Sequence, residues 1–176
     1  MSRTLIVGIG NYLMTDDAVG IHAVNALKES YDFPDYVELI DGGTKGVELL
    51  PYLEDCRRLM LIDAVDLREP HGTIRTIEGE DMKAFLDLKF SVHQIGIPDM
   101  LFAMEFKGIK PPEMCLVGIQ PASLETGTEM TEALAANFGG LLDMVICRLR
   151  DWDIEAREKN PGKERTSYRY VPGNTV

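Results

Sequence analysis

Short apolar runs alternate with amphipathic segments through the first 150 residues of the chain. The run Thr4–Ile9 (TLIVGI) has no charged side chain and is rich in β-branched residues, which is typical of a strand covered on both faces. Further runs with strand character cover residues 36–40, 59–62, 72–77 and 114–119. Strands that alternate with helices form βαβ units, so the pattern predicts an α/β fold.

The expected helices cover residues 16–29, 46–53, 81–88, 98–106 and 131–150. The last helix is the clearest, because its apolar side chains form one stripe: Leu134, Phe138, Leu141, Leu142, Val145 and Leu149. The run 72–77 alternates apolar and polar residues and carries Arg75 in its middle, which favours an edge strand that could run antiparallel. The sequence therefore predicts a three-layer α/β/α sandwich around a twisted, mostly parallel five-stranded sheet.

A length of 176 residues fits one domain of ordinary size. We expect a single α/β domain over residues 1–150. From residue 151 the chain is polar, lacks periodicity and contains two Pro-Gly pairs. Residues 151–176 are therefore predicted to form a flexible tail.

The net charge of −11 disfavours two classes of partner. An acidic body repels phosphate groups, so we expect neither nucleic-acid binding nor binding to an anionic membrane, although a basic protein would be attracted. Three widely separated cysteines argue against a disulfide framework and a cysteine-built zinc site, and Cys115 and Cys147 lie in apolar runs typical of a core. Without an 18-residue apolar run no membrane insertion is expected, and we predict a cytoplasmic monomer.

Acidic residues stand beside glycines at three predicted strand ends, where open α/β sheets bind their ligands. These ends are residues 8–17, Asp41-Gly42-Gly43 and Asp63. A carboxylate that closes an apolar strand is costly to bury alone, so Asp63 needs a cation, a metal or several amide donors. The structural alternative is that Asp63 caps the turn that follows the strand.

Asp16 and Asp17 fall at the expected start of the first helix. Acids favour the dipole of a first helical turn, and Thr15 or Asp16 could cap the helix. One acid is enough for that role, so the pair leaves one of the two acids to face the cleft. Together with Asp63 and with His93, which lies in a loop before a helix, Asp17 completes a set of one imidazole and two carboxylates. That set is typical of a borderline divalent metal such as Zn or Ni.

Gly8 and Gly10 suggest an alternative, a dinucleotide-binding turn, in which Asp41 would bind the ribose. The third glycine of that fingerprint is Leu13 here, and the two acids at the helix start would repel a phosphate. Dinucleotide binding is therefore the disfavoured hypothesis.

Five segments resemble, in the same order, the sequence blocks of the [NiFe]-hydrogenase maturation endopeptidases. They are GIGNYLMTDD (8–17), DGGTKGVELL (41–50), IDAVD (62–66), SVHQ (91–94) and GIQP (118–121). The resemblance covers about residues 3–149. It implies an endopeptidase that removes the C-terminal extension of the hydrogenase large subunit precursor after nickel has been inserted.

Carried over residue by residue, the resemblance assigns the metal-contacting and catalytic roles to Asp17, Asp63 and His93. The acid at the first position is Glu in some family members and Asp here. Asp41 and Gly42 are expected to shape the floor of the cleft. Nickel is expected to arrive with the substrate, although other divalent ions could occupy the site. One further alternative is a nickel- or substrate-binding maturation chaperone that uses the same three residues without proteolysis.

Overall fold

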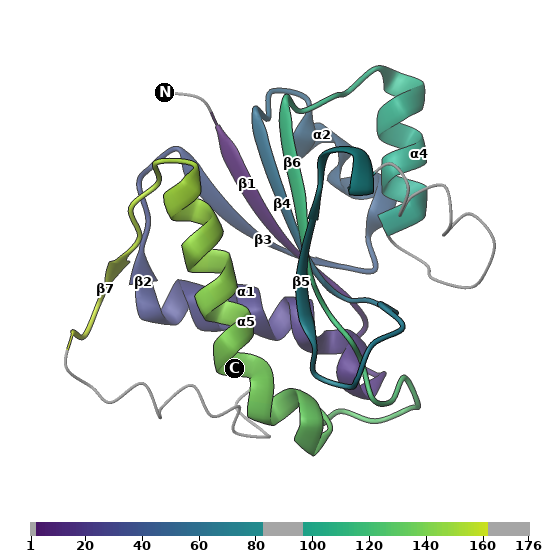
Figure 1. Cartoon of the computed structure of the whole chain (residues 1–176). Coiled ribbons are helices and arrows are strands. Elements are labelled where there is room, and N and C mark those ends of the chain that lie inside the picture. Colours follow the sequence, from purple (N-terminus) through teal and green to yellow (C-terminus); the bar gives the residue numbers. More distant parts are fainter. Residues whose placement is uncertain (1–2, 83–96, 162–176) are drawn as a thin grey trace.

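The computed structural model describes residues 3–82 and 97–161 of the chain. Within these residues, five strands form one mixed sheet in the order β3-β1-β4-β6-β5 (Figure 1). Their bounds are β1 Thr4–Ile9, β3 Val37–Gly43, β4 Arg58–Ala64, β5 Ile74–Glu78 and β6 Glu113–Ile119. Strands β3, β1, β4 and β6 are parallel, and β5 runs antiparallel to β6 at the edge. The predicted mostly parallel sheet with an antiparallel edge strand is confirmed.

Helices cover both faces of the sheet (Figure 1). One face carries α1 (Val19–Ser30) and α5 (Glu132–Asp151), and the other carries α2 (Leu50–Leu53) and α4 (Ile97–Lys107). Two 3-10 turns introduce helices: η1 (Thr15–Ala18) leads into α1 and η2 (Gly46–Leu49) into α2. The three-layer architecture follows from this arrangement, as the sequence predicts.

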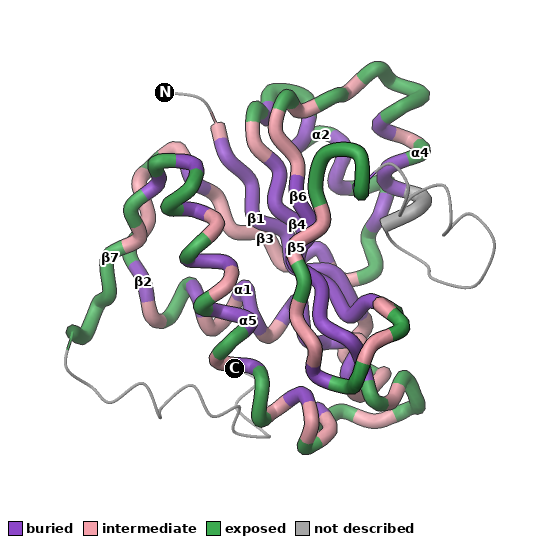
Figure 2. Tube along the Cα trace, viewed as in Figure 1, coloured by how far each residue is buried: buried purple, intermediate pink, exposed green. Residues whose placement is uncertain are grey.

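Successive residues of the central strands pack into different cores, which explains their uninterrupted apolar runs. In β4, Met60 and Ile62 join the cluster beneath α1 and α5, whereas Leu59 and Leu61 join the cluster beneath α2 and α4. Figure 2 shows the central strands as mainly buried and β5 as mainly intermediate or exposed. The alternation also fixes the face on which each polar residue near the end of a strand lies.

Several elements differ from the sequence prediction at their ends. Strand β3 continues through Asp41-Gly42-Gly43, and β4 includes Asp63, because the neighbouring parallel strands supply pairing partners there. The helix predicted over 16–29 is divided into η1 and α1. The helix predicted over 81–88 falls for the most part outside the described residues.

Packed structure extends past residue 150, the point at which the sequence places the start of a flexible tail. Trp152 and Ile154 are buried in the core beneath α1 and α5. Strand β7 (Arg157–Glu158) then pairs antiparallel with β2 (Tyr31–Asp32). Residues 151–159 contain two large apolar side chains, too few to reveal a periodic pattern.

The prediction that Cys147 belongs to the core is wrong, because its side chain lies on the exposed side of α5, away from the buried stripe. Cys115 is buried in β6, as expected. No helix in the described part of the chain is both long enough and apolar enough to cross a membrane.

Helix α1 lies unusually close to the sheet at Gly20. A Cβ atom at this position would stand 2.1 Å from the carbonyl oxygen of Ile62 in β4 and 2.4 Å from that of Ile9 in β1. On the strand side, a Cβ at Gly8 would stand 2.1 Å from the carbonyl oxygen of Gly20. Because the nearest obstructing atoms at both positions belong to the backbone, the contact requires glycine on both elements.

Replacing Gly20 with alanine is expected to lower the free energy of unfolding by about 2 kcal/mol or more, since α1 must move away from the sheet. The matched control is Gly139→Ala in α5, where no atom beyond the neighbouring residues and backbone of the helix itself lies within 4 Å of the new Cβ. There we expect a gain of about 0.5–1 kcal/mol from helix propensity. Urea unfolding of both variants measures the difference, and wild-type stability of Gly20→Ala would contradict the close contact.

Candidate functional site

Asp63 lies in β4, one residue before the carboxyl end of the strand. It pairs with Gly118 of β6 and is 7% exposed. Alternation along β4 places it on the same face as Leu59 and Leu61, toward α2 and α4. The structure therefore places the Asp63 carboxylate, nearly buried, at the carboxyl end of β4.

Asp17 lies in η1, which packs against β4. Its amide donates a hydrogen bond to the carbonyl oxygen of Met14 (2.8 Å). A Cβ at Gly10, the residue after β1, would stand 1.8 Å from the carbonyl oxygen of Asp17. The backbone of Asp17 is thus held against the end of β1, at the same carboxyl edge of the sheet that carries Asp63.

Asp16 has a different role from its neighbour, and one that the sequence does not predict. It is fully buried, and its carboxylate accepts hydrogen bonds from the loop between β6 and α5. The donors are the amides of Ala122 (2.8 Å), Ser123 (3.0 Å) and Thr131 (2.7 Å) and the hydroxyl of Thr131 (2.9 Å). Neither η1 nor α1 has a side-chain cap, so the predicted capping role of Asp16 or Thr15 is wrong.

Asp41 lies on the opposite face of the sheet from Asp63. In β3 it lies on the same face as Val37 and Leu39, which pack toward α1 and α5. The Tyr12 hydroxyl donates a hydrogen bond to the Asp41 carboxylate (3.2 Å) and accepts one from the side-chain amide of Asn25 in α1 (3.1 Å). This face assignment separates the two predicted carboxylates by the thickness of the sheet.

Burial and the charge of Asp41 act on the rings beside it. Burial, reinforced by the Asp41 carboxylate, raises the pKa of the Tyr12 phenol and keeps it a hydrogen-bond donor at neutral pH. The His22 ring packs edge-on against the Tyr12 ring, with 5.5 Å between ring centroids. Burial lowers the pKa of His22, and the Asp41 carboxylate opposes that shift.

Gly42 lies on the same face as Asp63. A Cβ there would stand 2.8 Å from Cγ1 of Val7 and 3.0 Å from both Cδ1 of Ile9 and the carbonyl oxygen of Gly8. Because Gly42 has no side chain, β3 can pack closely against the end of β1 at this position. The next residue is bonded to the segment after β1, because the Gly10 amide donates a hydrogen bond to the carbonyl oxygen of Gly43 (3.0 Å).

Gln120 is a second residue whose role sequence reasoning missed. It follows β6 and is nearly buried, and its Oε1 accepts hydrogen bonds from the amides of Leu67 (2.6 Å) and Glu69 (3.4 Å) in the loop after Asp63. Its own backbone joins this loop as well, since its carbonyl accepts a bond from Gly72 (2.9 Å). The GIQP segment was the only sequence signal that marked this position.

His93, the third predicted ligand, lies outside the described residues. Over residues 3–82 and 97–161, no three His, Cys, Asp or Glu side chains gather in a way that could hold a metal ion. The described part of the chain thus brings the segments of Asp17 and Asp63 to one edge. It does not add a different metal-binding cluster elsewhere.

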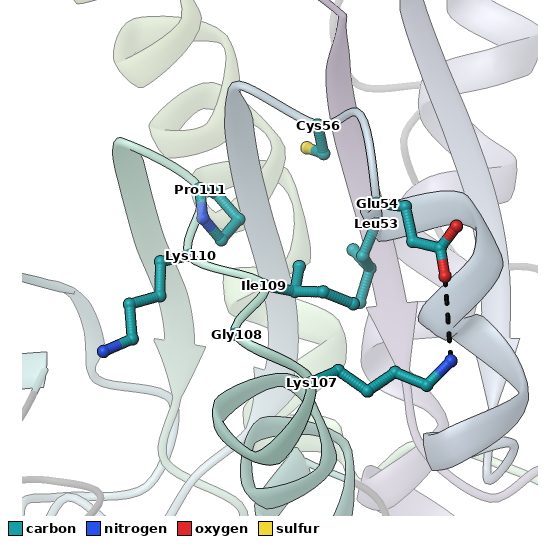
Figure 3. A pocket seen from close by; sticks show the side chains of 8 residues that line it. All are labelled: Leu53, Glu54, Cys56, Lys107, Gly108, Ile109, Lys110 and Pro111. Carbon is teal, nitrogen blue, oxygen red and sulfur yellow. Dashed lines mark ion pairs between the residues drawn. The ribbon is translucent and has the colours of Figure 1, made fainter.

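A cavity of about 470 Å³ opens at the other end of the sheet (Figure 3). It is lined by Leu53, Glu54, Cys56, Lys107, Gly108, Ile109, Lys110 and Pro111. Cys56 and Pro111 precede β4 and β6, so the cavity lies at the amino ends of these strands. Lys107 spans it with an ion pair to Glu54 (3.7 Å). The cavity contains none of the predicted site residues.

Comparison with known proteins agrees with the architecture and the sequence blocks. Residues 21–147 match the family model of the hydrogenase maturation proteases. The chain is 39% identical over 155 residues to the hydrogenase 2 maturation protease of Escherichia coli K12, covering 88% of this chain and 94% of that protein. It is also 37% identical over 155 residues to the hydrogenase expression/formation protein HupD of Rhodobacter capsulatus, covering 87% of this chain and 74% of HupD.

Solved structures give the same result. The hydrogenase maturating endopeptidase HybD of E. coli matches with a TM-score of 0.81 and 38% identity, over 89% of this chain and 98% of HybD. A hydrogenase 2 maturation peptidase from Thaumarchaeota archaeon SCGC_AB-539-E09 matches with a TM-score of 0.64 and 30% identity, over 84% and 98% of the two chains. The chain therefore belongs to the hydrogenase maturation protease family.

Proposed function

We propose that this endopeptidase removes the C-terminal extension of a [NiFe]-hydrogenase large subunit precursor after nickel has been inserted. The observation that carries the proposal is the nearly buried carboxylate of Asp63 at the carboxyl end of β4, in a chain that belongs to this protease family. The neighbouring segment brings Asp17 to the same edge of the sheet. That edge is where open α/β folds place their ligand sites.

We assign the contacts with the metal to Asp17, Asp63 and His93. Two carboxylates and one imidazole suit a borderline divalent ion and leave coordination positions open. The nickel is part of the substrate, held by cysteine thiolates of the precursor. These three side chains would complete its surroundings when the precursor docks at the carboxyl edge.

The reaction itself is hydrolysis of one peptide bond near the bound metal. A water molecule adds to the scissile carbonyl carbon, its proton passes to a basic group at the site, and the C–N bond breaks as the leaving nitrogen gains a proton. We assign these proton transfers to the carboxylates of Asp17 and Asp63. A nearby cation lowers the pKa of water and stabilises the developing negative charge on the carbonyl oxygen.

Recognition of the metal would also make the enzyme selective for mature substrate. A precursor without nickel offers no cation to Asp17 and Asp63, and Asp63 is already largely removed from water. Nickel in the mature precursor would give the two carboxylates an additional positive partner, so the complex with mature precursor is favoured over the complex with immature precursor. Cleavage would then follow nickel insertion, because the attraction between the nickel and the two carboxylates favours binding of the nickel-loaded precursor.

Asp41 and Gly42 are assigned supporting roles at the cleft. Gly42 keeps the floor low on the face that carries Asp63, since any side chain there would press on Val7 and Ile9. Asp41 acts from the other face, where its bond to Tyr12 tethers the loop between β1 and η1.

We further propose that the protein acts as a cytoplasmic monomer. Its three cysteines are free thiols, as a reducing compartment favours.

Incubation with a nickel-loaded large subunit precursor is expected to release one C-terminal fragment, measured by intact mass of the precursor before and after the reaction. The same precursor without nickel is expected to remain intact, a discrimination of at least about 10³-fold. Cleavage of both precursors would retain the protease and remove the metal-sensing role of Asp17, Asp63 and His93. Binding of a cognate precursor without cleavage would favour a non-proteolytic maturation chaperone.

Asp63→Asn is expected to abolish processing, with a loss of at least about 100-fold in kcat/KM, because the carboxylate that meets the metal is replaced by a neutral amide of the same shape. The matched control is Asp55→Asn, an exposed residue near the amino end of the same strand. It removes the same charge and should process precursor at the wild-type rate. Circular dichroism and thermal unfolding establish that both variants fold, and full processing by folded Asp63→Asn would overturn the assignment.

A further inference from the structure

We propose that Asp16 is a positioning residue that holds Asp17 in place by clamping the loop between β6 and α5. The inference rests on the proposed function for its catalytic consequence. The clamp itself is a structural claim about contacts between residues more than 100 positions apart in the sequence. We call the bonds from Ala122, Ser123 and Thr131 to the Asp16 carboxylate the Asp16 clamp.

The Asp16 clamp saturates a fully buried carboxylate with donors. Oδ2 accepts three hydrogen bonds, from the amides of Ala122 and Ser123 and from the Thr131 hydroxyl. Oδ1 accepts the fourth, from the Thr131 amide. Thr131 immediately precedes α5, so the clamp fixes both the start of this loop and the start of the helix that ends it. Four donors are enough to replace the water that an ionised carboxylate loses on burial.

A second set of bonds joins the loop to the residues that immediately precede Asp16. The Thr15 amide donates to the carbonyl of Gly127 (2.8 Å), and the Thr15 hydroxyl donates to the carbonyls of Ser123 (2.8 Å) and Glu125 (3.2 Å). The Gly127 amide donates to the carbonyl of Leu13 (3.0 Å). The segment before Asp17 is thus bonded to the loop residue by residue.

These bonds determine the backbone position of Asp17. Its amide is bonded to the carbonyl of Met14, which itself bridges to the loop, and its carbonyl is pressed against Gly10. The turn η1 has only four residues, and it packs against β4. The loop beyond β6 therefore supplies the rigid surface against which Asp17 is placed, and the Asp16 carboxylate is the group that holds that surface.

The geometry requires a carboxylate and not its amide. Asparagine has one acceptor oxygen and an NH₂ group that only donates. If the oxygen replaces Oδ2, the NH₂ group faces the Thr131 amide, and if it replaces Oδ1, the NH₂ group faces three donors. Either orientation sets donor against donor in a buried position, which opens the clamp.

The test compares Asp16→Asn and Thr131→Val with two controls, Thr131→Ser and Glu132→Gln. Thr131→Val removes one hydroxyl bond at nearly constant volume, whereas Thr131→Ser keeps the hydroxyl. Glu132→Gln removes an exposed acid beside the clamp. Amide hydrogen exchange by NMR is read at Asp17 and over residues 122–131, and kcat and KM are measured on the nickel-loaded precursor.

In Asp16→Asn we expect exchange at the Asp17 amide and in the loop to become roughly tenfold to hundredfold faster. We expect kcat/KM to fall about tenfold to hundredfold, because a misplaced reacting group loses its alignment. Thr131→Val should show the same changes to a smaller extent, and both controls should match wild type. Unchanged protection of the Asp17 amide in folded Asp16→Asn would overturn the proposal.

Two further outcomes remain decisive. If Asp16→Asn does not fold, the pair Thr131→Val and Thr131→Ser decides, because only the first lacks the hydroxyl bond: equal exchange at Asp17 in the two variants would overturn the clamp. If wild-type protein does not cleave the precursor, the proposed function fails. The exchange pattern at Asp17 still confirms or rejects the positioning role by itself.

Discussion

The close contact between α1 and the sheet determines where the rest of the site can lie. Because Gly20 has no side chain, the start of α1 rests directly on the backbone of Ile9 and Ile62, at the ends of β1 and β4. The turn before α1 is then drawn onto Gly10. A larger residue at Gly8 or Gly20 would lift the helix, and with it η1, away from the strand end that carries Asp63. Backbone packing thus places Asp17 and Asp63 at the same edge before any side-chain chemistry acts.

The two-residue period of the strands divides the acidic residues between two tasks. Asp63 and Gly42 lie on the face toward α2 and α4, whereas Asp41 lies toward α1. Asp41 is therefore engaged with Tyr12 and, through it, with Asn25. It contributes to the site by anchoring the loop that leads to η1. A sequence in which Asp41 and Asp63 both follow apolar strands does not reveal this, because the face depends on the register of each strand.

The sequence predicts most of the fold because its signals are local. The buried run Thr4–Ile9, the apolar stripe of α5 and the alternation around Arg75 each specify an element and its place in the sheet. The roles of Asp16 and Gln120 depend instead on amides that are 51 to 115 residues away in the chain, and no local pattern encodes such partners. The same reason explains Trp152, whose burial depends on tertiary contacts beyond the last periodic segment.

The two ends of the sheet are stabilised by different interactions, and this difference bears on function. At the amino end, the guanidinium groups of Arg58 and Arg148 lie 5.9 Å and 5.2 Å from the centre of the Trp152 ring, and β7 pairs with β2. Both guanidinium groups are also ion-paired, Arg58 with Glu113 and Arg148 with Glu78, so they stabilise the packing at this end. At the carboxyl end, the buried side chains of Asp16 and Gln120 satisfy the backbone of the surrounding loops. Loops held by side-chain hydrogen bonds can keep Asp17 in a fixed position and still leave the strand ends open to a substrate.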